Sequence, residues 1–155
     1  VMVICAGVKA ILDLPRTLEY LETMGVTVVG YQSDNLGDFY TRDSHLKVDG
    51  RVDTPEAAAR LIKAKEDYSL RGGILVSNPI PEKESLDEKM INKAIDEALK
   101  DAEKEHIKGK KVTPYLLSKV TELTEGDSLK ANIALILNNA ALGAKIAKEY
   151  YLLHD

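Results

Sequence analysis

The sequence contains a single cysteine, Cys5, among 155 residues. One cysteine cannot form a disulfide within the chain, so a small disulfide-stabilised secreted fold is excluded and a reducing compartment such as the cytoplasm is expected. Long hydrophobic runs are also missing. No apolar stretch approaches the roughly 20 residues of a membrane-spanning helix, so the sequence predicts no membrane partner.

The sequence also lacks an excess of positive charge and any spacing typical of metal ligands. The net charge is −4, and lysine and arginine are scattered along the chain rather than gathered in a stripe. A nucleic acid polymer is therefore not an expected partner, whereas a small phosphorylated ligand needs only a few local donors. The three histidines, His45, His106 and His154, lie far apart in the sequence, so we expect no zinc site built from them.

The composition is that of an ordinary globular domain. Hydrophobic residues make up 45% and charged residues 30% of the chain, and 155 residues fit one domain. The chain begins with the apolar run VMVIC, which is typical of a buried strand, whereas chain termini usually lie at the surface. We therefore expect residues 1–155 to form a single α/β domain that is the C-terminal part of a longer chain.

Hydrophobic patterns predict the order of the elements. A strand, a helix and a strand follow one another at 1–5, 15–24 and 26–30, a βαβ unit that makes parallel pairs. A long irregular connection follows, with a short strand near 46–48. The remaining predicted elements are a helix from Pro55, a strand at 74–77 and helices at 85–104, 113–123 and 129–151.

These elements predict an α/β fold, with a mostly parallel sheet, flanking helices and a helix-rich C-terminal half. The helix that begins at Pro55 is expected to bury a stripe that ends at Tyr68. The last helix is apolar nearly all round, which places it in the interior.

Lys9 is the first candidate for chemistry. It stands in one of three loops, 6–9, 32–35 and 78–81, that follow strand ends, where ligands bind in open parallel sheets. A lysine held there among apolar neighbours is poorly hydrated, which lowers its pKa and favours a neutral amine that can attack a carbonyl carbon. The alternative is that Lys9 extends into water while its methylenes cover apolar surface.

Asn132 is the second candidate. On the last predicted helix it shares a face with Ile136, Asn139 and Gly143. A buried amide needs hydrogen-bond partners, because an unpaired one costs about 1–3 kcal/mol. Either these asparagines bond loop backbone, or one amide points into a cavity and binds a sugar hydroxyl or a reacting lysine.

Four long blocks occur in order along the chain. They are CAGVKAILDLPRTLEYLETMGV at 5–26, GYQSD at 30–34, GGILVSNPIP at 72–81 and GKKVTPYLLSKVTELTEGDSLKANIALILNNAALGAKIA at 109–147. Together they resemble the pseudouridine-5'-phosphate glycosidase family, also called indigoidine synthase A-like. The resemblance covers essentially the whole chain, and the family's chains are about twice as long, with the CAG-x-K motif near their middle.

The resemblance implies an activity and three site residues. The family reversibly cleaves the C–C glycosidic bond of pseudouridine 5'-phosphate, giving uracil and ribose 5-phosphate. Lys9 matches the lysine that forms a Schiff base with C1' of the opened ribose, and Asn132 matches an active-site asparagine. Asn78, argued from its position after a strand, is added as a substrate contact.

The resemblance also implies parts that this chain lacks. The family's general-acid glutamate, its manganese-binding aspartate and most of its phosphate-binding residues lie upstream of CAG-x-K. Family members form homotrimers. Two alternatives stay open: a Schiff-base lyase acting on another phosphosugar, and a catalytically incomplete fragment with a structural or partner-binding role.

Overall fold

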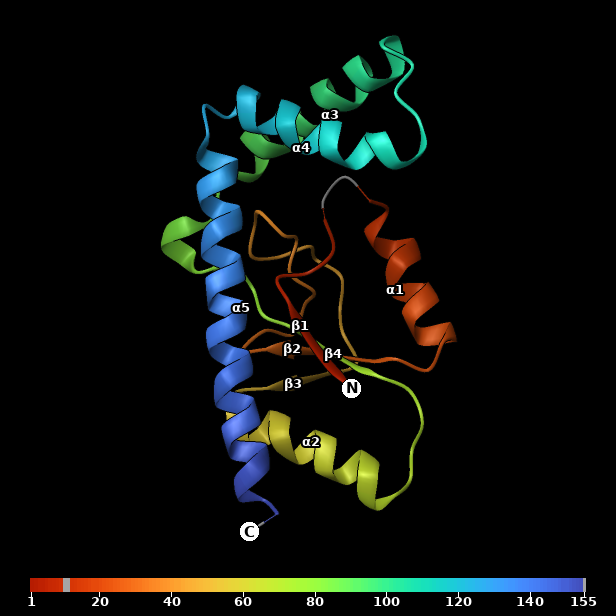
Figure 1. Ribbon diagram of the computed structural model, residues 1–155, viewed down its shortest axis with the longest axis vertical. Helices are drawn as coiled ribbons and strands as arrows, with labels where there is room; N and C mark the ends of the chain where they lie inside the picture. Colours follow the sequence, from red (N-terminus) through yellow and green to blue (C-terminus); the bar gives the residue numbers. More distant parts are fainter. Residues whose placement is uncertain (10–11, 155) are drawn as a thin grey trace.

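Four parallel strands form one sheet in the computed structural model, which describes residues 1–9 and 12–154 (Figure 1). The order across the sheet is β1-β4-β2-β3, and every neighbouring pair is parallel. The strands are β1 (Met2–Cys5), β2 (Thr27–Tyr31), β3 (Gly50–Val52) and β4 (Ile74–Ser77). Because the strands are parallel, all their carboxyl ends lie at one edge, where Ser77 pairs with Cys5 on one side and Gly30 on the other.

Within the described residues, five α-helices surround or extend this sheet. They are α1 (Leu14–Thr23), α2 (Pro55–Asp67), α3 (Glu88–Lys104), α4 (Val112–Leu123) and α5 (Asp127–Leu152), with 3₁₀ turns η1 (Glu82–Glu84) and η2 (Gly109–Lys111). Side-chain caps begin three of the helices: Asp13, Thr54 and Asp87 each accept a hydrogen bond from a backbone N–H in the first turn. These caps explain why α1, α2 and α3 begin where they do.

The longest helix, α5, runs along the length of the molecule and contributes to two hydrophobic clusters (Figure 1). Its first half places Ala131 and Leu135 against α3 and α4. Its second half places Leu142 and Ile146 against the sheet and α2. The helix thus connects the helical pair at one end of the molecule to the sheet at the other.

The predicted fold class is confirmed, with three corrections of detail. The third strand is β3 at Gly50–Val52, whereas the segment near 46–48 makes only an isolated bridge from Lys47 to Asn35. Tyr68 is 77% exposed, because α2 buries the smaller Ala58 and Ala59 instead. The last helix is not buried all round: Ile133, Ile136 and Leu137 on α5 are each more than half exposed.

None of the helices in the described part of the chain is both long enough and apolar enough to cross a membrane.

Candidate active site

Lys9 lies just beyond the carboxyl end of β1, in the first of the three predicted loops. Its side chain is half-buried, and its carbonyl accepts a hydrogen bond from the N–H of Leu12 at 2.8 Å. Residues 10–11, which separate the two, lie outside the described part of the chain. Burial raises the pKa of the nearby Cys5 thiol, more than a hydrogen bond from Gly7 lowers it, so the thiol stays protonated at neutral pH.

The segment before Lys9 packs against a second loop, at 37–39. Gly7 and Asp38 form an antiparallel bridge, and the N–H of Phe39 donates to the carbonyl of Ala6 at 3.1 Å. Gly7 has a φ of 103°, and a Cβ atom there would lie 1.7 Å from the carbonyl oxygen of Gly37. Only glycine therefore fits, and the path of the chain toward Lys9 is fixed by backbone contacts.

The exit of β4 is joined to α5 by asparagines. Asn78 is only 4% exposed; its N–H donates to the carbonyl of Cys5 at 2.7 Å and its Nδ2 donates to Oδ1 of Asn139 at 3.0 Å. One position earlier on α5, Asn138 donates from Nδ2 to the carbonyl of Pro79 at 3.3 Å. Asn139, on the predicted helix face, thus bonds the side chain of Asn78 and not loop backbone, whereas the backbone of the strand exit is bonded by Asn138, which lies outside that face.

Asn132 lies two turns before Asn139 on α5, about 10 Å along the helix axis. It is half-buried, and its side chain takes part in none of the hydrogen bonds among the described residues. Those bonds also do not join Asn132 or Asn78 to the Lys9 side chain. Of the predicted site residues, the structure therefore places Lys9 and Asn78 at neighbouring strand ends and leaves the Asn132 amide without a bond to them.

A hollow of about 200 Å³ lies at the exits of β2 and β4. Its lining includes Tyr31, Gln32, Arg42, Asn78 and Asn138. The Nη1 of Arg42 donates to the carbonyl of Ile80 at 2.6 Å, which holds the guanidinium against the loop that follows β4. Sequence reasoning missed Arg42, because it falls in the irregular connection 31–53, where no periodic pattern shows which side chains point toward the sheet edge.

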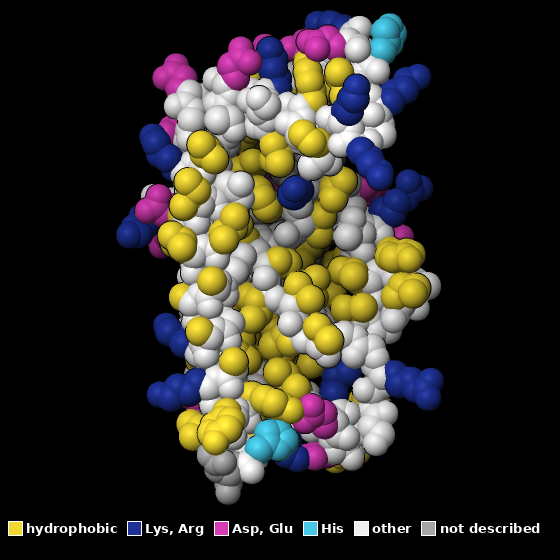
Figure 2. All heavy atoms as spheres, in the orientation of Figure 1, with side chains coloured by type: hydrophobic (Ala, Val, Ile, Leu, Met, Phe, Trp, Pro, Cys, Tyr) yellow, Lys and Arg dark blue, Asp and Glu magenta, His cyan; other side chains and the backbone are white. Residues whose placement is uncertain are grey.

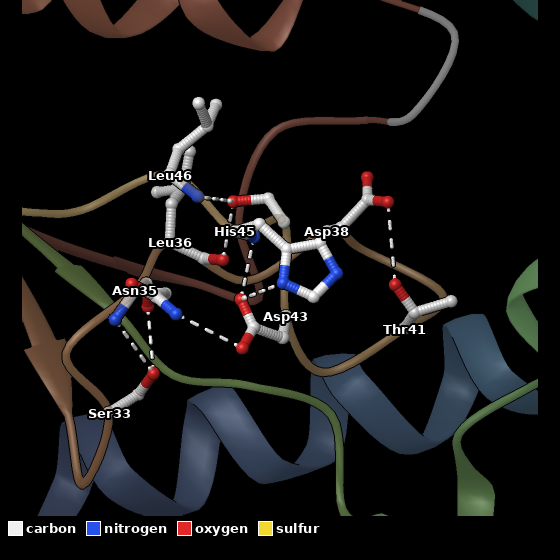
Figure 3. A network of polar contacts seen from close by, with 9 residues as sticks. Ser33, Asn35, Leu36, Asp38, Thr41, Asp43, His45 and Leu46 are labelled. Carbon is white, nitrogen blue, oxygen red and sulfur yellow. Dashed lines mark hydrogen bonds and ion pairs between the residues drawn. The ribbon is translucent and has the colours of Figure 1, made fainter.

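Asp38 is the second residue that the sequence did not reveal. Its Oδ2 accepts a hydrogen bond from the Thr41 hydroxyl at 3.3 Å, whereas its Oδ1 is enclosed and has no hydrogen-bond donor among residues 1–9 and 12–154 (Figure 3). Burial raises its pKa to about 6; the Thr41 bond opposes this shift and the negative charge of Glu88 adds to it. A carboxyl group with this pKa can both give and accept a proton near neutral pH.

Asp43, in the same loop, has the opposite environment. Burial acts to raise its pKa, but hydrogen bonds from the N–H of His45 at 2.6 Å and from Nδ2 of Asn35 at 3.0 Å help lower it below the ordinary value (Figure 3). The Asp43 carboxylate is thus ionised and used to shape the loop. Asp43 is therefore a structural carboxylate, whereas Asp38 has one carboxylate oxygen without a hydrogen-bond donor among the described residues.

Apolar side chains gather in the hollowed face between α1 and α5 (Figures 1 and 2). Val3 on β1 and Leu12, just before α1, are each about half exposed. β1 stands at one end of the strand order, with β4 as its one neighbour among the described strands. The site near Lys9 therefore opens onto a surface with considerable apolar area.

The described residues contain no set of side chains that could bind a metal ion. No three or more histidine, cysteine, aspartate or glutamate side chains among them lie close enough together to bind one. The manganese implied by the resemblance would therefore need ligands outside these residues.

Comparisons with known proteins give one consistent relationship. The family model described as indigoidine synthase A like protein matches residues 1–149. A pseudouridine-5'-phosphate glycosidase of Caldanaerobacter subterraneus subsp. tengcongensis is 59% identical over 147 residues, which are 95% of this chain and 48% of that protein. A protein of the same name from Petrotoga mobilis is 56% identical over 153 residues, 99% of this chain and 50% of that protein.

Two solved structures share the fold. The prealnumycin C-glycosynthase AlnA, in complex with ribulose 5-phosphate, matches with a TM-score of 0.89 and 35% identity over 99% of this chain and 50% of its own. An indigoidine synthase A-like protein of Thermotoga maritima matches with a TM-score of 0.83 and 34% identity over 94% of this chain and 48% of its own. The chain spans about half the length of the curated relatives and of both structures.

Proposed function

Because the chain belongs to the indigoidine synthase A-like family, we propose that it contributes the Schiff-base lysine, Lys9, of a pseudouridine-5'-phosphate glycosidase. The observation that carries the proposal is the position of Lys9, half-buried at the carboxyl edge of a parallel sheet, where such sheets bind ligands. Two relatives that are more than half identical over nearly the whole chain have this name.

The chemistry is simplest in the direction of C–C bond formation. The amine of Lys9 attacks the aldehyde carbon C1' of open-chain ribose 5-phosphate, and loss of water gives an iminium ion. The iminium carbon accepts the electron pair of the C5=C6 bond of uracil, which forms the C–C bond, and the nitrogen takes up the electrons of the C=N bond. Loss of the proton from C5 then restores the uracil ring. The 4'-hydroxyl then attacks C1', which closes the ring and breaks the bond from C1' to the Lys9 nitrogen; the hydroxyl loses its proton and the departing amine takes one up. Cleavage runs the same steps backwards, so the covalent link supplies the electron sink that a C–C bond otherwise lacks.

The backbone that leads to Lys9 suits this role because contacts with a second loop hold it in place. The bridge from Gly7 to Asp38 and the bond from Phe39 to Ala6 fix the segment that leads to the lysine. A nucleophile fixed in advance loses less entropy when it reaches its reactive geometry.

The two asparagines are proposed as substrate contacts of different kinds. The amide of Asn132 forms no hydrogen bond among the described residues, so both its donor and its acceptor can serve sugar hydroxyls. The Nδ2 of Asn78 already donates to Asn139. The side-chain oxygen Oδ1 of Asn78 is therefore the atom left for a substrate, in the hollow that Arg42 also lines. Manganese and the homotrimer remain predictions that rest on the family.

Borohydride reduction in the presence of ribose 5-phosphate tests the proposal. In the full-length natural protein that contains this chain, we expect one reduced adduct, on the peptide that carries Lys9. The Lys9→Ala variant should give no adduct and no turnover, whereas Lys83→Ala, which removes an exposed lysine, should behave as wild type. An adduct on another lysine, or none on Lys9, overturns the assignment.

A second candidate function is C-glycoside synthesis or cleavage with a base other than uracil. The fold match to a C-glycosynthase in complex with ribulose 5-phosphate favours this candidate. Consumption of ribose 5-phosphate that depends on uracil supports the first function; a Lys9 adduct without uracil-dependent consumption supports the second. Residues 1–155 expressed alone should be inactive if the other half of the site lies outside them.

A further inference from the structure

One face of the sheet is only partly covered. Val3 on β1, Leu75 on β4 and Val28 on β2 are paired in register, so their side chains point to the same face. Exposure rises along this row toward β1: Val28 is 1% exposed, Leu75 is half-buried and Val3 is 52% exposed. The cover over this face therefore ends between β2 and β1.

The helices explain why the two faces differ. On the opposite face α2 and the second half of α5 pack across the strands, and Ile4, Val76 and Val29 lie in their hydrophobic cluster. On the face of Val3 the helix is α1, which packs mainly against β2. Of the described helices, α1 is also the one without a fully buried residue. The described part of the chain thus leaves β4 and β1 without a helix on this face.

The uncovered strip has the width and the chemistry of a helix-packing site. Neighbouring strands lie about 4.8 Å apart, so β4 and β1 together present a strip about 10 Å wide, and one α-helix is about 10–12 Å across. A helix packed beside α1 at the usual axial distance of about 8–10 Å would lie over this strip. Its strand side chains, Val3, Cys5 and Leu75, are uncharged, and Figure 2 shows apolar side chains gathered in a hollow between α1 and α5. Parallel sheets are almost always covered by helices on both faces.

We propose that the other half of the full-length protein places an amphipathic helix on this strip, beside α1. The curated relatives and both solved structures are about twice as long as this chain, so a comparable length of polypeptide is available to supply the helix. A helix of the same polypeptide is present at high effective concentration, which favours it over a second copy of the chain. Because β1 leads to Lys9, the helix would also shield the strand that carries this lysine from water. The inference does not depend on the role of Lys9 in the proposed function.

Thiol labelling of the full-length natural protein tests whether the strip is covered. Val3→Cys is made in a Cys5→Ala background, and its reaction with a small maleimide is followed by peptide mass mapping in the folded and in the guanidinium-unfolded protein. We expect folding to slow the labelling of Val3→Cys by roughly 100-fold or more, because a covered thiol reacts only when the contact opens. Tyr68→Cys, at the exposed end of α2, is the control and should be slowed only a few-fold. Labelling of Val3→Cys that folding slows no more than that of Tyr68→Cys overturns the proposal.

Photochemical cross-linking identifies what covers the strip. Leu12, between β1 and α1, is half exposed, so Leu12→Cys in the same background can be labelled with a benzophenone maleimide and irradiated. We expect cross-links within one polypeptide, from Leu12→Cys to peptides outside residues 1–155. Cross-links that run to a second chain show that another copy covers the strip and overturn the proposal, as do cross-links confined to residues 1–155. Neither measurement uses turnover, so failure of the proposed function would leave both results unchanged.

Discussion

The side-chain oxygen of Ser77 accepts a hydrogen bond from the backbone N–H of Gly37 at 2.8 Å, although 40 residues separate the two along the chain. Ser77 is fully buried at the carboxyl end of β4. Gly37 in turn lies against the carbonyl of Ala6, on the segment that leads to Lys9. One hydroxyl group thus connects the central strands of the sheet to the loop that supports the proposed nucleophile.

Replacing Ser77 with alanine should therefore destabilise the protein and slow its chemistry. The buried N–H of Gly37 would lose its acceptor, which costs about 1–3 kcal/mol of unfolding free energy. Denaturant unfolding of the full-length protein measures this loss, and borohydride trapping measures the rate at Lys9. Ser118→Ala, on the exposed side of α4, is the control and should be nearly neutral. Equal effects of the two variants would contradict the prediction.

A methyl group at Gly37 should disturb the Lys9 segment directly. A Cβ atom there would lie 2.5 Å from the carbonyl oxygen of Ala6, and because this neighbour is backbone it cannot rotate away. Overpacking of this kind costs about 1–3 kcal/mol, and displacement of the Ala6 carbonyl should lower the trapping rate at least tenfold. Gly50→Ala is the matched control, since its Cβ would meet only Val29 Cγ1 at 3.8 Å. A Gly37→Ala variant with normal stability and activity would show that the segment is not fixed by this contact.

Alanine variants of Asn78 and Asn139 distinguish an effect on substrate binding from an effect on stability. Alanine at either position removes the same hydrogen bond, so both variants should lose about 0.5–1.5 kcal/mol of unfolding free energy. Only Asn78→Ala should also raise KM, because only Asn78 lines the hollow beside Arg42. If both variants raised KM equally, the bond itself, rather than a contact from Asn78, would explain the effect.

The raised pKa of Asp38 predicts how its contribution to stability depends on pH. The folded protein binds this proton more tightly than the unfolded chain does, because the pKa rises from the ordinary 3.8 to about 6 on folding. The stabilising contribution is complete below about pH 4 and is lost as the pH rises through 6. Asp38→Asn, measured by denaturant unfolding, should gain stability relative to wild type between pH 4.5 and pH 7.5. A difference that is constant with pH would contradict the shift.

Much of the fold could be predicted from periodicity, and the exceptions have local causes. β1, β2 and β4 are dense in apolar residues, whereas β3 at Gly50–Val52 contains glycine and arginine and, of the described strands, pairs with β2 alone at the edge of the sheet. The predicted burial of Tyr68 was wrong because α2 packs closely through Ala58 and Ala59, which brings small side chains to the interface. Tertiary contacts of this kind leave little trace in a hydrophobic pattern.

The candidate site was only partly predictable for a different reason. Lys9 could be found because it interrupts an apolar run, and Asn132 because it interrupts an apolar helix. Asp38 and Arg42 lie in a loop that contains many other polar and charged residues, so nothing in the sequence pattern distinguishes them. Their position depends on which backbone groups the loop meets, such as the bridge between Gly7 and Asp38, and that is a property of the folded chain.

Because α5 packs in both hydrophobic clusters, it affects how the molecule unfolds. Leu135 belongs to the hydrophobic cluster that α5 forms with α3 and α4, and Leu142 belongs to the cluster that α5 forms with the sheet and α2. Less than two helical turns separate the two residues. Fraying of the helix at either end would leave this central stretch intact. We therefore expect amide protons near residues 135–142 to be among the slowest to exchange with deuterated water, and the helical pair and the sheet to come apart in one cooperative event rather than one after the other.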